Sequence, residues 1–146
     1  MSIIPELTIH VTNITSVFEF IVKLNDIGWN WKNEKGETEF LPLNDHDNFN
    51  WCCKELTSAE LFHLTTEKEK ANETVGIQLY YHSGKVGITL LANKSSAYSF
   101  SLNCNRVKRA EESGIGYTDV NWYIEKIIWE LQKQNVQIEF MQYQEF

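Results

Sequence analysis

The sequence predicts an α+β fold in which a largely antiparallel sheet carries about three helices on one face. Residues 75–104 contain three apolar-alternating runs joined by two turn signals, which is the pattern of a β-meander. Shorter alternating runs lie on both sides of it, and three other segments repeat apolar residues at helical spacing. The expected order is β-α-β-β-α-β-β-β-α-β. Hairpins outnumber βαβ units in this order, so we expect mainly antiparallel strands.

The first strand and the first helix of this order are expected at the start of the chain. Residues 3–11 alternate weakly and carry a proline near their start, where a strand tolerates the missing N–H. Ser16 and Glu19 then fit a capping box, and apolar residues recur at helical spacing to about Asp26. We therefore expect an amphipathic helix from Ser16 to Asp26.

A hairpin and a second helix are expected next. Alternating runs at residues 29–31 and 38–40 flank a turn-rich segment, which favours a hairpin. Thr57 and Glu60 form a second capping box. The helix that they open should lose its order within the charged run of residues 67–73.

After the meander, one more helix and one more strand are expected. Residues 105–116 are polar and contain glycine, which indicates a loop. Thr118 or Asp119 then caps a strongly amphipathic helix that should end near Asn135. Residues 136–140 alternate and predict the last strand. No linker or repeat interrupts this order, so residues 1–146 are expected to form a single domain.

The composition is typical of a globular, intracellular protein. Hydrophobic residues make up 42% of the chain and charged residues 23%, so most of the length should be ordered. The three cysteines, two of them adjacent at Cys52 and Cys53, do not form the spaced framework of a disulfide-rich secreted domain. The sequence has no signal-like start and no run of about 20 apolar residues. We expect a cytoplasmic protein without a membrane segment.

The net charge of −7 is concentrated in one half of the chain. Residues 1–73 hold 13 acidic and 6 basic side chains, whereas residues 74–146 hold 7 of each. Negative potential of this kind repels nucleic acid and acidic membranes, and it speeds encounter with a basic protein. We therefore expect neither nucleic acid nor membrane as a partner.

No motif in the sequence indicates catalysis or metal binding. The residue types that zinc prefers occur in one segment, at His46, Cys52, Cys53 and His63. Structural zinc sites pair cysteines two to four residues apart, and adjacent cysteines seldom bind one ion. Cys104 shares the alternation of a buried strand, and no nucleophile elbow is present to activate a serine. We expect no catalytic residue, no metal and no cofactor.

An alternative function is suggested by a basic segment, Arg106, Lys108 and Arg109. Glycines at positions 114 and 116 and a helix start follow it. Free N–H groups and the helix dipole favour an anion at such a place. The P-loop lysine and the complete dinucleotide fingerprint are both missing. The alternative is a small-molecule or anion-binding domain, which could also be a small enzyme, with a pocket near Arg106 and Arg109.

The leading candidate for a binding surface is the acidic segment of residues 34–73. It holds ten acidic and four basic side chains, and the aromatic residues Phe49 and Trp51 lie within it. Acidic groups around aromatic anchors are the composition expected of a surface that captures a basic protein. The residues proposed to contact a partner are Asp45, Asp47, Phe49, Trp51 and Glu55.

The chain resembles small bacterial immunity proteins of polymorphic or contact-dependent toxin systems. The resemblance rests on size, acidity, the α+β pattern and the aromatic- and Asn-rich stretches DHDNFNWCCKEL and GYTDVNWYIEKIIWEL. It implies a cytosolic inhibitor that covers the active site or the substrate-binding surface of a cognate toxin domain. Toxins that attack nucleic acid are often basic, so an acidic face would speed capture and aromatic anchors would slow release.

Overall fold

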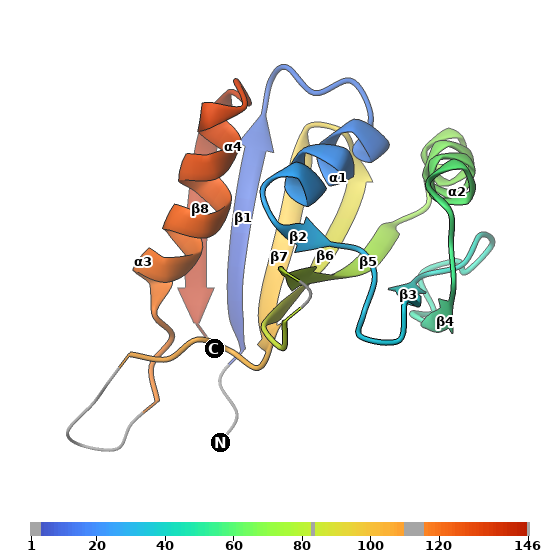
Figure 1. The fold of residues 1–146 in the computed structure, drawn as a ribbon. Coiled ribbons are helices and arrows are strands. Elements are labelled where there is room, and N and C mark those ends of the chain that lie inside the picture. Colours follow the sequence, from blue (N-terminus) through green and yellow to red (C-terminus); the bar gives the residue numbers. More distant parts are fainter. Residues whose placement is uncertain (1–3, 83, 110–115, 146) are drawn as a thin grey trace.

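One antiparallel sheet of eight strands organises the protein, which the computed structural model describes over residues 4–82, 84–109 and 116–145 (Figure 1). The strands lie in the order β4-β3-β5-β6-β7-β1-β8, and β2 pairs with β5 beside this path. The predicted α+β fold with a largely antiparallel sheet is confirmed. The strands are β1 Pro5–Val11, β2 Trp29–Asn30, β3 Thr38–Phe40, β4 Cys52–Lys54, β5 Val75–Tyr81, β6 Gly87–Lys94, β7 Ala97–Cys104 and β8 Ile138–Glu145.

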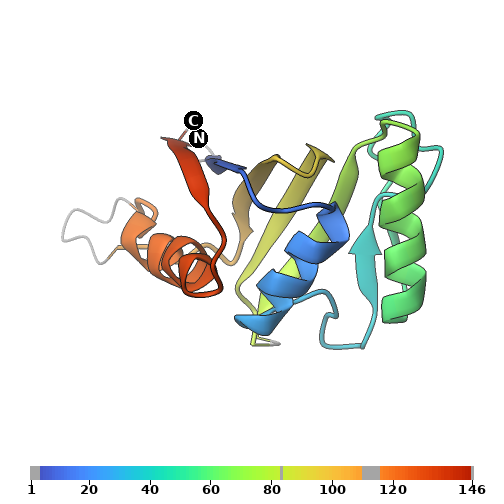
Figure 2. The same cartoon turned by 90° about the horizontal axis from the view of Figure 1, so that it is seen from above.

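The helices lie along one side of the sheet (Figure 2). They are α1 (Val17–Asp26), α2 (Ser58–Lys70) and a C-terminal helix in three parts, α3 (Val120–Tyr123), η1 (Ile124–Trp129) and α4 (Glu130–Lys133). Among the described residues, none of these helices has the length and apolar character needed to cross a membrane.

The core lies between the helices and the inner face of the sheet. Leu7 and Ile9 of β1 are buried there, and Phe100 of β7, paired with Leu7, is buried beside them. Helix α1 packs Phe20 onto Tyr98, with the ring centroids 3.6 Å apart. Alternate residues of each strand therefore fill one core, as period-two alternation requires.

The C-terminal helix begins at the expected place, because the carboxylate of Asp119 accepts a hydrogen bond from the Trp122 amide (3.3 Å). Its central turn is a π-helix. The indole of the fully buried Trp29 donates a hydrogen bond to the Lys126 carbonyl within that turn (3.0 Å). A side chain that enters the hydrogen-bond ladder is a known cause of such irregularity, so packing accounts for the π-turn.

The predicted hairpin between residues 29–31 and 38–40 is wrong. Strand β2 pairs with β5, Trp29 opposite Tyr81, whereas β3 pairs with β4 and β5. Burial of the Trp29 indole against the C-terminal helix holds β2 at that place. Strand β4 was not expected, since Cys52, Cys53 and Lys54 do not alternate between apolar and polar residues as residues 38–40 do.

Two element ends also differ from the prediction. Helix α2 continues to Lys70 instead of losing its order from residue 67, because Lys68 turns inward and is buried. Strand β8 continues to Glu145 rather than stopping at residue 140, since it pairs with β1 along its whole length.

Candidate functional site

Within residues 4–82, 84–109 and 116–145, no helix covers the side of the sheet opposite α1, α2 and the C-terminal helix, and this side carries several cavities. We call this surface the open face. Three cavities of about 500, 450 and 340 Å³ lie on it, and the first two share Glu39 and Cys53. The open face is formed by strand residues of the outward parity, which include Thr8, Glu39, Cys53, Gln78, Tyr80, Thr89, Ser99 and Asn103.

Two aromatic side chains from the segment before β4 lie on this open face. Phe49, 47% exposed, lines the 340 Å³ cavity together with Thr8 and Leu91. Trp51, 43% exposed, lines the 450 Å³ cavity together with Glu39. The structure therefore places both predicted aromatic anchors beside cavities of the same surface.

A buried ion pair fixes the loop that carries these aromatics. Lys68 of α2 is only 1% exposed, and its ammonium donates to the Pro42 carbonyl (2.6 Å) and pairs with Glu73 (3.4 Å). The Glu73 carboxylate in turn accepts hydrogen bonds from the amides of Asn44 (2.8 Å) and Asp45 (3.2 Å). The start of the loop is thus tied to α2 by charge-assisted hydrogen bonds, the stronger class.

Asp45 fixes the rest of the loop. Its side chain is 5% exposed, and the carboxylate accepts hydrogen bonds from the amides of Phe49 (2.9 Å) and Asn50 (3.0 Å). These bonds offset the cost of a backbone with positive φ, which non-glycine residues rarely adopt. The positive-φ residues of the loop are Asn44, His46, Asp47 and Phe49.

The other predicted contact residues are divided between the interior and solvent. Asp45 is turned inward and positions the loop, so it has no free carboxylate to offer a partner. Asp47 and Glu55 are exposed, one within the loop and one just after β4. Neither residue lines the three cavities, and their role as charged residues at the rim of the partner-binding surface stays a prediction.

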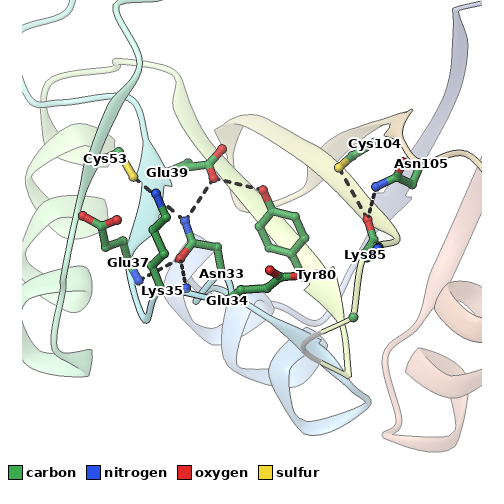
Figure 3. A pocket seen from close by; sticks show the side chains of 11 residues that line it. Asn33, Glu34, Lys35, Glu37, Glu39, Cys53, Tyr80, Lys85, Cys104 and Asn105 are labelled. Carbon is green, nitrogen blue, oxygen red and sulfur yellow. Dashed lines mark hydrogen bonds between the residues drawn. The ribbon is translucent and has the colours of Figure 1, made fainter.

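Glu39 of β3 is the acidic residue that two cavities of the open face share, and it is not among the five residues proposed to contact a partner. Its Oε1 accepts hydrogen bonds from the Tyr80 hydroxyl (3.0 Å) and the Asn33 amide (3.2 Å) (Figure 3). Tyr80 and Asn33 therefore hold the carboxylate in one orientation. The 500 Å³ cavity beside it is lined by three acidic residues, Glu34, Glu37 and Glu39, and by two lysines, Lys35 and Lys85.

The electrostatics of this cavity disfavour nucleophilic chemistry. Desolvation raises the pKa of the Cys53 thiol, and the carboxylates of Glu37 and Glu39 raise it further. Burial likewise raises the pKa of the Cys104 thiol at the other end of the cavity. The thiolate is the nucleophile, so a thiol with a raised pKa is a weak one at neutral pH. Three carboxylates and two ammonium groups line the cavity, so the lining has an excess of one carboxylate.

The residue types proposed for zinc are not gathered at one place. Within residues 4–82, 84–109 and 116–145, no group of three or more His, Cys, Asp or Glu side chains could hold a metal ion. Cys52 and Cys53 project to opposite sides of β4, because they are consecutive residues of one strand.

The basic segment proposed for anions is partly used by the fold. The Arg106 guanidinium donates to the Thr118 hydroxyl (2.8 Å) and helps to lower the pKa of the Glu145 carboxyl. Lys108 and Arg109 are exposed beside the short bridge between Lys108 and Thr118. None of the three lines the open-face cavities. Gly114 lies outside the described residues.

Comparisons with known proteins found no matching family model, no matching curated protein and no matching solved structure.

Proposed function

We propose that this chain is a binding protein that captures a basic protein partner on its open face. The observation that carries the proposal is that Phe49 and Trp51 come from one ordered segment and each lines a cavity of the open face, Trp51 the one that includes Glu39. Aromatic side chains in such positions supply most of the binding energy of protein interfaces. A loop that is already ordered avoids the entropy cost of ordering on binding.

The charge of the surface supports a basic partner. Three carboxylates and two lysines line the largest of the open-face cavities, and the exposed carboxylates of Asp47 and Glu55, outside it, add to this excess of negative charge. Complementary charge speeds association and orients the partner before contact. The aromatic anchors act at a later step, since they slow dissociation.

The proposed partner is the toxin domain of a bacterial toxin system. This domain is a basic protein that degrades nucleic acid, and the chain neutralises it in the cytoplasm. This assignment is supported by the resemblance to immunity proteins and by the concentration of negative charge in the first half of the chain. A protein that blocks its target by coverage needs a large rigid surface and no catalytic group.

The deciding experiment is co-expression with the product of the neighbouring reading frame. We expect that product to be toxic alone, harmless together with this chain, and to co-purify with it. Toxicity that persists during co-expression, or a neighbour that neither binds nor kills, would contradict the proposal.

The interface is tested by two tryptophan variants with matched exposure. Trp51→Ala should raise the dissociation constant about 30-fold, which corresponds to a loss of about 2 kcal/mol of binding free energy, as expected of a hot-spot residue. Trp129→Ala removes a tryptophan that is 54% exposed on η1 and should leave affinity unchanged. Equal affinities of the two variants, measured by calorimetry, would remove the open face from consideration.

Reversing the charge of the two exposed acids tests whether they act on the rate of association or on the rate of dissociation. Asp47→Lys with Glu55→Lys should slow association and flatten its salt dependence, with little effect on dissociation. Asp45 is left intact in this experiment, since its carboxylate holds the loop. A rate constant for association that does not change would show that these acids lie away from the partner.

A further inference from the structure

Strand β4 is an edge of the sheet and borders the open face. It pairs with β3 through Glu39 opposite Cys53 and Phe40 opposite Cys52. Within the described part of the chain, no strand lies on its outer side. An unpaired edge presents N–H and C=O groups that can pair with a strand of another protein.

An apolar groove runs along this edge on the helix side. Two cavities of about 400 and 570 Å³ lie between β4 and α2 and share Phe40, Leu43, Lys54 and Leu64. Leu56 and Ala59 extend the lining toward the start of α2. The other sheet edge, β8, has an irregular register near its start and lines none of the five cavities described above.

The two sides of β4 differ in chemistry. Cys52 and Lys54 share the parity of buried Phe40 and Thr38 and line the groove. Cys53 has the parity of Glu39 and faces the acid-lined cavity of the open face. A strand added beside β4 continues the pleat, so its alternate residues would face these two surfaces in turn.

We propose that the partner docks by strand addition to β4, with apolar side chains in the groove against α2 and basic side chains over the open face beside Glu39. The inference rests on the proposed function for the basic character of the partner, and it deepens that function by naming the recognised element. The partner segment is an extended strand in which lysine or arginine alternates with aliphatic residues. Main-chain pairing supplies affinity and the alternation supplies specificity.

A synthetic peptide tests this inference without the natural partner. The probe is a nine-residue peptide, capped at both ends, that alternates lysine with valine. Its control has the same composition, with the five lysines first and the four valines last. We expect the alternating peptide to bind about tenfold more tightly by fluorescence anisotropy, and to protect amides of Cys52–Lys54 from hydrogen exchange.

Two variants of α2 locate the peptide. Ala59→Glu places a larger side chain in the groove from an exposed position, so folding should be unaffected. We expect this variant to bind the peptide about fivefold more weakly or worse. Because the added negative charge would by itself attract a basic peptide, such a loss can come only from filling the groove. Phe62→Glu adds the same charge at an exposed site of α2 outside the groove and should not weaken binding.

Three results would overturn strand addition: equal affinity for both peptides, no protection of β4 in the bound state, or no binding at about 1 mM peptide. Any of them leaves the proposed function intact if the toxin domain still binds in a Trp51-dependent manner. Conversely, alternating peptide bound at β4 together with a harmless, non-binding neighbour would keep the docking site and reject the toxin assignment.

Discussion

The two faces of the sheet are built from the same strands but differ in what fixes their side chains. On the inner face, Leu7, Ile9 and Phe100 are held by apolar contacts with the helices. On the open face, Glu39 and Thr89 are held by hydrogen bonds to Tyr80 and Gln78. Apolar packing is non-directional and supplies stability, whereas hydrogen bonds set the orientation of groups that can meet a ligand. The inner face therefore maintains the fold and the open face is available for recognition.

The largest expected effect comes from an aromatic residue of the inner face. Phe20→Ala removes a fully buried ring that stacks on Tyr98, and should lower the free energy of unfolding by about 3–5 kcal/mol. Trp51→Ala on the open face should change it by less than about 1 kcal/mol, since the side chain is 43% exposed. Urea denaturation of both variants measures the contrast. A Trp51 variant as unstable as the Phe20 variant would mean that Trp51 belongs to the core.

The second-largest effect concerns the ion pair between Lys68 and Glu73, which ties the loop carrying the open-face aromatics to α2. Lys68→Ala leaves the largely buried Glu73 without its cation, so we expect a loss of about 3 kcal/mol in unfolding free energy and a loosened loop at residues 42–50. Lys70→Ala breaks the exposed pair with Glu67 and should cost less than about 0.5 kcal/mol. Denaturation gives the energies, and limited proteolysis reports the loop. A loop that stays resistant in Lys68→Ala would show that Asp45 alone is sufficient to hold it.

The smallest expected effect tests the electrostatic potential at the open face. Because Glu37 and Glu39 contribute to the raised pKa of Cys53, Glu37→Gln should lower that pKa. More thiolate is then present at a given pH below the pKa, so alkylation by iodoacetamide at pH 8 should become faster. Glu67→Gln, the same change at a half-buried position of α2 that lines none of the open-face cavities, serves as the control. The rate is followed for Cys53 by peptide mass spectrometry. Identical rates in both variants would indicate that Glu37 does not contribute to the raised pKa of the thiol.

The aromatic part of the candidate site could be anticipated from the sequence, but its acidic part could not. Phe49 and Trp51 attract attention because large rings are unusual in a polar, turn-rich segment. Glu39 and Tyr80 are 41 residues apart and meet only because β3 pairs with β5. One signal was present, since Tyr80 has the parity opposite to buried Leu79 and must point away from the core.

Asp45 shows the converse difficulty. In the sequence it is one acid among several around two rings, and its composition alone suggests surface exposure. The structure turns it inward because the amides of Phe49 and Asn50 need an acceptor in a loop with positive φ. Such a local arrangement depends on backbone angles that the residue pattern does not specify.

The sequence by itself determined the meander, α1, the start of the C-terminal helix and the inward parity of the apolar residues in the middle of the meander strands, since these follow from periodicity and capping within a short stretch of chain. Only the tertiary structure decided that β2 pairs with β5 and, in the described part of the chain, that the short β4 forms an edge and that one face of the sheet stays free of helices. These features depend on contacts between distant segments, whose energies are shared among many residues and leave no local pattern. The candidate site belongs to this second group because it lies where such contacts meet.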